Sequence, residues 1–211
     1  MLSTNSRVLM YGRVADGGVF KNSSPSTALE QNSINLPDPT PLPGKSDPIL
    51  FVIAADDAFP LKQYMLKPYA QVGLTKQKRI YNYRLSCARR VSENAFGILA
   101  NRFRVFMQPI HLIPERVETI VLACCSLHNF LRVRLGSCSA YIPASSIDTE
   151  NQETHEIVQG QWRHGPQPQD LQPLERQGSN RPANSAKQLR DYMCDYLNSD
   201  VGSVSWQKNV V

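Results

Sequence analysis

Apolar residues recur at helical spacing in two long stretches of the chain. From residue 76 to 103 they return every three or four positions, and residues 114–135 repeat the pattern. Pro114 suits the first turn of the second stretch, because its missing N–H would have no helical partner there. We therefore predict two long amphipathic helices. A shorter third helix is predicted over 185–197, with Ser185 as a possible N-cap.

The remaining apolar residues lie in short runs near the N-terminus. Residues 49–54 form a continuous apolar run that follows a proline-rich loop, which is typical of a strand buried on both faces of an α/β sheet. Residues 8–11 indicate a strand fragment, Asp16-Gly17-Gly18 is a turn signal, and residues 23–35 are weakly helical. Strands followed by long helices predict an α/β fold.

Composition changes after residue 135. Residues 136–184 are rich in Gln and Pro and poor in large apolar side chains, which favours a linker or a loosely draped segment. We predict a domain over 1–135, a Gln/Pro-rich linker over 136–184, and a C-terminal helix and extended tail over 185–211. Trp206-Gln207 would either dock this tail onto the core or remain free.

Overall charge and cysteine content restrict the environment of the protein. The 211 residues carry 23 basic and 18 acidic side chains, a net charge of +5 and only a mild preference for polyanions. No apolar run approaches the roughly 20 residues that cross a bilayer, so no membrane contact is expected. The five cysteines form no CxxC pair, which favours reduced thiols in an intracellular protein.

Asp56 is the first candidate for chemistry. It directly follows the apolar run 49–54, and ligands of α/β folds gather at the carboxyl ends of strands. Asp56 and Asp57 could therefore bind a metal ion there. A solvated acidic turn would have the same sequence.

Glu93 is the only acidic residue among ten basic ones between residues 61 and 105. A solvated helix face normally mixes charges of both signs. Gly97 lies on the same face and would allow close approach of another backbone or a ligand. Pairing of Glu93 with Arg89 or Arg90 on an ordinary surface is the alternative interpretation.

Isolated carboxylates in a basic field suit two-metal phosphodiester chemistry. One divalent ion activates water or a hydroxyl group, and the other stabilises the leaving oxygen. Mg²⁺ or Mn²⁺ would accept such oxygen ligands. Basic side chains would then hold the DNA backbone. The candidates for DNA binding are Lys62, Arg84, Arg89, Arg90 and Arg102.

Several motifs together resemble the PIF/Harbinger transposase-derived DDE endonucleases. Residues 56–61 (DDAFPL) resemble the second-aspartate motif of that family. Residues 79–86 (RIYNYRLS) and 89–99 (RRVSENAFGIL) resemble its glutamate helix, which is the most specific part because several residues agree in register. The segment 11–20 and the run 128–131 (HNFL) resemble the parts before and after these motifs.

The resemblance implies an RNase H-like fold with a DDE triad. In register, Asp56 takes the second aspartate and Glu93 the glutamate, as catalytic and metal-binding residues. Asp57 is the adjacent, weaker metal ligand. The family's first aspartate lies on a strand that would precede Met1, so we expect an N-terminally truncated RNase H-like core. Asp16 is the nearest upstream acid and a poor substitute, because displaced carboxylates seldom restore metal geometry.

The same resemblance implies nuclear action on DNA, with a Myb-like protein as a possible partner and some cytoplasmic presence allowed. Two functions remain open on the sequence. The chain is either a divalent-metal-dependent endonuclease, or a catalytically inactive remnant that binds DNA or a protein. Its oligomeric state is not indicated by any motif.

Overall fold

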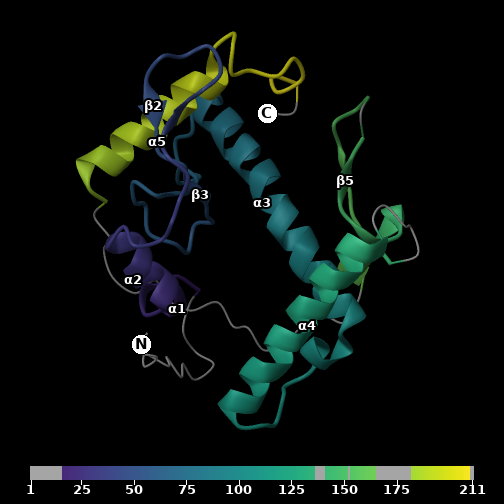
Figure 1. Ribbon diagram of the computed structural model, residues 1–211. Coiled ribbons are helices and arrows are strands. Elements are labelled where there is room, and N and C mark those ends of the chain that lie inside the picture. Colours follow the sequence, from purple (N-terminus) through teal and green to yellow (C-terminus); the bar gives the residue numbers. More distant parts are fainter. Residues whose placement is uncertain (1–15, 136–140, 152, 165–181, 210–211) are drawn as a thin grey trace. The chain divides into compact units, whose positions relative to one another are not determined.

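The computed structural model describes residues 16–135, 141–151, 153–164 and 182–209 (Figure 1). The chain divides into two units, one formed by residues 1–89 with 172–211 and the other by residues 90–171. Each is described by itself. Helices and three two-stranded sheets occur in the described residues, which confirms the α/β class.

Two short helices open the described part of the first unit. α1 spans Asp16–Lys21 and α2 spans Ser24–Glu30, with Ser23 as its N-cap. The turn predicted at Asp16-Gly17-Gly18 is therefore wrong. Glycine has a low helix propensity, but only glycine fits at position 17, because a Cβ there would collide with the carbonyl oxygen of Ala58. The strand predicted over 8–11 lies outside the described residues.

Four short strands follow in this unit. β1 (Thr40–Pro41) pairs antiparallel with β2 (Pro48–Ile49), and β3 (Ile53–Ala54) pairs parallel with β4 (Met65–Leu66). The prediction of one strand over 49–54, buried on both faces, is wrong. Leu50, Phe51 and Ile53 are each at least 40% exposed. Each of these pairs has only two strands in the described structure, so too few neighbours are present to cover both faces.

The core of the first unit forms where α3 (Lys76–Arg102) meets α5 (Asn184–Asn198). Tyr81 of α3 is 1% exposed and packs with Tyr69 and Cys194, the two tyrosine rings lying 5.1 Å apart, edge to face. Both α3 and α5 agree with their predicted ranges, 76–103 and 185–197, to within one residue at each end. The N-cap of α5 is Ala183 rather than Ser185, and it makes no side-chain capping bond.

The side chain of Asn82 on α3 fixes the loop that precedes the helix. Its amide nitrogen donates to the Tyr69 carbonyl at 3.0 Å, and its oxygen accepts from the Tyr69 N–H at 2.8 Å. The hydroxyl of Tyr69 donates to Asp191 on α5 at 2.6 Å. Burial raises the pKa of Tyr69 strongly, and the bond to Asp191 adds to that rise, so this phenol stays a donor at physiological pH.

The C-terminal segment docks onto the first unit through Gln207. Its side chain is fully buried, accepts from Arg84 at 2.9 Å and donates to the Leu197 carbonyl at 2.8 Å. Of the two alternatives that the sequence left open for the tail, the structure shows the docked one.

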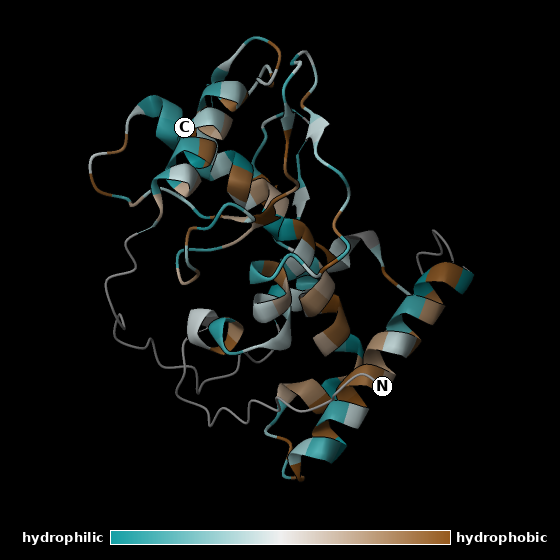
Figure 2. Ribbon diagram, turned by 60° about the vertical axis from the view of Figure 1, so that its left-hand side comes forward, coloured by the Kyte–Doolittle hydropathy of each residue, from teal (hydrophilic) through white to brown (hydrophobic). Residues whose placement is uncertain are grey.

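The second unit begins within α3. The 3-10 helix η1 (Arg104–Met107) and α4 (Pro114–Leu135) follow, and α4 has the bounds that its apolar pattern predicts. Cys124 is buried, whereas Leu122, Phe130 and Val133 are more than half exposed. Apolar and polar residues alternate along the long helices (Figure 2). None of the described helices is long and apolar enough to cross a bilayer.

Part of the predicted linker over 136–184 is folded. It contains η2 (Ala144–Ser146), an antiparallel pair of β5 (Thr149–Glu150) with β6 (Ile157–Val158), and η3 (Gln161–His164). Polar contacts to Asn94 and Arg90 of α3, rather than large apolar residues, hold these elements in place.

Replacing Gln207 by Ala should lower the free energy of unfolding by about 1–3 kcal/mol, because Arg84 and the part-buried Leu197 carbonyl would each lose a partner. Urea denaturation of the full chain measures the change. Lys208→Ala, at an exposed neighbouring position, is the control. Equal stability of the two variants would show that the tail is not docked in solution.

Candidate functional site

Asp56 lies in the first unit, two residues after the end of β3. The N–H of Ala55 donates to the Leu66 carbonyl at 2.8 Å and so extends the parallel pairing up to the candidate residue. One carboxylate oxygen of Asp56 accepts from the Ala58 N–H at 2.8 Å, which stabilises the turn that follows. The expected placement of Asp56 at the carboxyl end of a parallel strand is therefore observed.

The other carboxylate oxygen of Asp56 faces a cation. It lies 3.5 Å from Nη2 of Arg89 on α3, and the carboxylate remains about one third exposed. Asp57 is more exposed, and one of its oxygens lies 3.4 Å from Nζ of Lys67. This partial exposure leaves the Asp56 carboxylate reachable by a ligand from solvent.

The turn after Asp56 packs against α1. Gly17 lies against the Ala58 carbonyl, and the rings of Phe20 and Phe59 meet edge to face at 5.6 Å. The two segments that resemble one family in the sequence are thus neighbours in the first unit. Asp16 is the first residue of α1, and its side chain lies outside the described residues.

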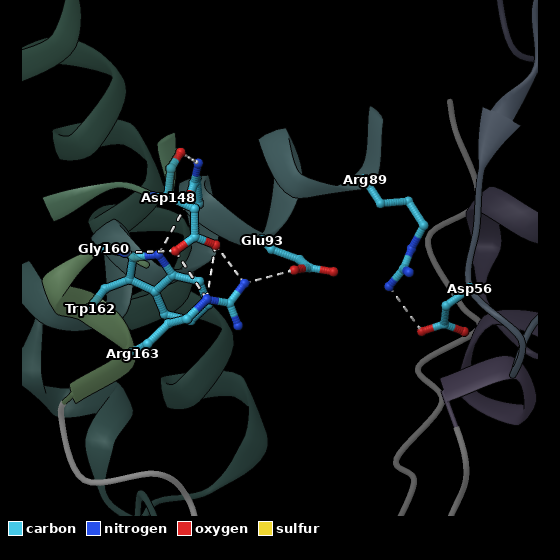
Figure 3. A network of polar contacts seen from close by, with 8 residues as sticks. Asp56, Arg89, Glu93, Asp148, Gly160, Trp162 and Arg163 are labelled. Carbon is cyan, nitrogen blue, oxygen red and sulfur yellow. Dashed lines mark hydrogen bonds and ion pairs between the residues drawn. The ribbon is translucent and has the colours of Figure 1, made fainter. Parts of the chain in front are cut away.

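Glu93 lies in the second unit, on the C-terminal half of α3. Its carboxylate accepts from Nη2 of Arg163 at 3.2 Å (Figure 3). Arg163 belongs to η3, within the segment predicted to be a linker. Arg89 and Arg90 were the partners predicted for Glu93, and Arg163 was not among them.

Asp148 holds Arg163 more tightly than Glu93 does. Nε of Arg163 lies 3.0 and 2.9 Å from the two carboxylate oxygens of Asp148, and Nη2 lies 2.5 Å from the second. The Gly160 N–H donates to the same carboxylate at 2.8 Å. The Asp148 side chain is completely buried. Burial raises its pKa, but the bonds from Arg163 and Gly160 outweigh that effect and leave the pKa below its ordinary value.

Asn94, the residue after Glu93, binds the backbone of Asp148. Its amide nitrogen donates to the Asp148 carbonyl at 3.1 Å, and its oxygen accepts from the Asp148 N–H at 2.9 Å. The indole N–H of Trp162 donates to the same oxygen at 3.1 Å. The Trp162 ring covers Gly97, where a Cβ would collide with it. The close approach expected at Gly97 is therefore made by an indole ring.

The five side chains predicted to bind DNA all contact other parts of the protein. Arg89 faces Asp56, and Lys62 pairs with Glu30 at 3.0 Å. The remaining three contacts are Arg84 with Gln207, Arg90 with Glu150 at 3.4 Å, and Arg102 with the carbonyl and ring of Tyr141. Their contribution to DNA binding stays a prediction.

Asp148, Arg163, Trp162 and Asn94 were not singled out from the sequence. Three of them lie in a polar segment whose composition hides their partners. One signal was available, since Trp162 is a large aromatic residue inside a Gln-rich stretch and needs something to cover it. Gly97 on α3 is the surface that receives it.

Asp56 and Glu93 offer oxygen ligands of the kind that Mg²⁺ and Mn²⁺ prefer, and both carboxylates are partly exposed. The two residues belong to different units. No group of three acidic, histidine or cysteine side chains in the described part of the chain is arranged to hold a metal ion. The donor chemistry of each carboxylate thus fits a hard divalent cation.

Comparison with known proteins places the candidate residues in a family context. A family model described as DDE superfamily endonuclease matches residues 3–129, which include Asp56 and Glu93. "Protein ALP1-like" from Arabidopsis thaliana is 27% identical over 122 residues. That match covers 57% of this chain and 30% of the plant protein, so the chain spans about a third of its relative. No solved structure matches.

The depressed pKa of Asp148 predicts a loss of stability in acid. A carboxyl group whose pKa is lower in the folded state contributes stability above its unfolded pKa of about 4, and loses it as the pH falls through the folded value. Asp148→Asn should flatten this dependence and lower stability at pH 7 by about 2 kcal/mol. Urea denaturation of the full chain between pH 7 and 3 measures both effects.

Glu153→Gln removes an exposed carboxyl group from the same unit and should keep the wild-type slope. An Asp148→Asn profile that is parallel to the wild-type profile would contradict the assignment.

Proposed function

Since the chain belongs to the DDE superfamily endonucleases, we propose that it acts on DNA phosphodiester bonds by divalent-metal chemistry, with Asp56 and Glu93 as the metal-binding carboxylates. The observation that carries this proposal is the match over residues 3–129, which includes both carboxylates in the motifs that resemble the family. The family as a whole generally uses divalent metals.

Asp56 and Glu93 would hold Mg²⁺ or Mn²⁺ through carboxylate oxygens. When bound, the metal ions supply activation of the attacking hydroxyl group and stabilisation of the leaving oxygen. Asp57 is the weaker candidate because it lies on the exposed side of the turn beside Lys67. Asp16 ranks below it, as a carboxylate displaced from the expected first-aspartate position.

Arg89 has two uses in this proposal. Its guanidinium compensates the Asp56 carboxylate when no cation is present, because it lies 3.5 Å away. It would turn to a DNA phosphate when a cation takes that carboxylate, since guanidinium groups bind phosphate and carboxylate in the same manner. Lys62, Arg84, Arg90 and Arg102 are further basic side chains available for the backbone of DNA.

The architecture proposed for this function is an RNase H-like core of PIF/Harbinger type. The short parallel pairing of β3 with β4, followed by the long helix α3, supports that arrangement. Nuclear action and a Myb-like partner belong to the same proposal, and the resemblance of the glutamate helix supports them. Localisation of the tagged chain, together with capture of a Myb-domain protein, would test them.

The nuclease proposal predicts that the full chain nicks supercoiled plasmid DNA only when Mg²⁺ or Mn²⁺ is present. Asp56→Asn and Glu93→Gln should each reduce the rate by at least about 100-fold, because each removes a metal-binding carboxylate. Glu118→Gln, an exposed acid of α4, is the charge-matched control and should behave as wild type. Equal nicking by wild type and Glu93→Gln would indicate a contaminant, and no nicking at any metal concentration would remove the enzyme function.

Non-catalytic binding of DNA is the second candidate function. The observation that favours it is that each candidate carboxylate is compensated by an arginine, so a folded state without metal is electrostatically satisfied. It predicts sequence-tolerant DNA binding whose affinity falls with salt, as counterions are released from the phosphates. Titration of labelled duplexes at 50 and 200 mM salt measures this, and an affinity that ignores salt would count against it.

A further inference from the structure

Arg163 contacts two carboxylates, those of Asp148 and Glu93, and it contacts them unequally. Arg163 makes three short contacts to the carboxylate of Asp148 and one longer contact, 3.2 Å, to Glu93. Asp148 is fully buried, whereas the side chain of Glu93 is 39% exposed. Arg163 is therefore held mainly by Asp148, and its contact with Glu93 is the longer of the two.

Asp148, which anchors Arg163, is itself fixed to α3. Asn94 forms two hydrogen bonds with the backbone of Asp148, and Trp162 donates to the same Asn94 side chain. The guanidinium of Arg163 lies over the indole ring of Trp162 at 4.3 Å. Its edge is thus held by Asp148 and its face by Trp162, so little freedom remains to the donor that points at Glu93 (Figure 3).

The charge balance around Arg163 favours a role as a fixed hydrogen-bond donor to Glu93 over a role that blocks cation binding there. An unpaired arginine beside Glu93 would repel a divalent cation approaching that carboxylate. Asp148 balances the charge of Arg163 through a fork-like contact, and the Asp148 side chain of that pair is completely buried. What remains near Glu93 is an oriented N–H donor with little net charge.

We infer that Arg163 is a positioning residue for Glu93, fixed in place by Asp148, and that the segment carrying them is part of the working nuclease unit. This inference rests on the proposed metal chemistry at Glu93. Asp148 and Arg163 lie beyond the residues 3–129 that match the family model. Carboxylates that hold metals depend on hydrogen bonds that orient them, and loss of such a bond costs about 10–100-fold in activity or metal affinity.

The first measurement needs no activity and concerns the anchor. The Nε–H of Arg163 should exchange slowly with water and give a resolved signal in ¹⁵N NMR of the full chain, assigned by its loss in Arg163→Gln. The signal should persist in Glu93→Gln and disappear in Asp148→Asn. Loss of the signal in Glu93→Gln would overturn the inference, because Glu93 would then be an anchor.

The second measurement is Mn²⁺-dependent plasmid nicking by folded variants. Arg163→Gln should lower kcat by about 10–100-fold and leave KM for DNA nearly unchanged. Arg163→Lys should stay close to Arg163→Gln, because a lysine keeps the charge without the fork. Arg116→Gln, which removes an exposed arginine from the same unit, should behave as wild type. Recovery by Arg163→Lys, or faster nicking by Arg163→Gln, would overturn the inference.

A double variant separates positioning from general stability. If Arg163 acts through Glu93, then Arg163→Gln should have no further effect on Mn²⁺ binding in a Glu93→Gln background. Binding is measured by electron paramagnetic resonance without DNA. An equal loss in both backgrounds would show that Arg163 only supports the fold and would overturn the inference.

The outcomes for the proposed function and for this inference are distinct. A wild-type chain that cleaves no DNA, but whose Mn²⁺ affinity falls about 10–100-fold in Arg163→Gln, refutes the nuclease function and keeps the positioning role. If the wild-type chain nicks DNA and Arg163→Gln nicks it equally fast, the nuclease function is kept and the positioning role is refuted. Absence of any Mn²⁺ binding refutes both.

Discussion

Both units depend on α3. In each unit an asparagine side chain of this helix forms hydrogen bonds with the backbone N–H and carbonyl of one loop residue. Asn82 binds the N–H and carbonyl of Tyr69 in the first unit, and Asn94 binds those of Asp148 in the second. Backbone groups that leave a sheet or helix must find partners when they are buried. One side-chain amide satisfies a donor and an acceptor at once, so a loop can pack on a helix without forming a strand.

The attachment at Asn94 places a charge where water cannot reach it. A fully buried carboxylate is stable only if it is paired and hydrogen-bonded, and Asp148 obtains this from Arg163 and the Gly160 N–H. These bonds bring residues 160–163 onto the end of α3. Trp162 then covers Gly97, and Arg163 reaches Glu93. The surroundings of Glu93 therefore follow from the hydrogen bonds and the charge partner that buried Asp148 needs.

The two candidate carboxylates have similar local environments although they lie in different units. Each is partly exposed, and each is compensated by a guanidinium group. The arginine that faces Asp56 is Arg89 of α3. The arginine that faces Glu93 is Arg163, which comes from a segment distant in the sequence and is held by Asp148. The second arrangement is the more restrained one. In the proposed metal chemistry, Glu93 would have beside it an arginine whose own charge is already balanced by Asp148.

The sequence alone determined the long helices and the family. The ranges of α3 and α4 follow from apolar spacing, which reports burial on one face of a helix directly. Asp56 and Glu93 became the candidate residues because motifs of several residues agree in register, and both lie within the matched residues 3–129. Chemistry that depends on a few residues in fixed local context is visible in the chain itself.

Tertiary structure decided what those residues touch. Gly17 packs so closely on the Ala58 carbonyl that no Cβ would fit, and Leu50, Phe51 and Ile53 are exposed because few neighbours pair with their segment. The segment 144–164 is folded by polar bonds to α3 rather than by an apolar pattern, so its composition resembles that of a linker. The bond between Glu93 and Arg163 joins residues 70 positions apart, and no local pattern predicts such a pair. Contacts of this kind are set by the packing of distant elements.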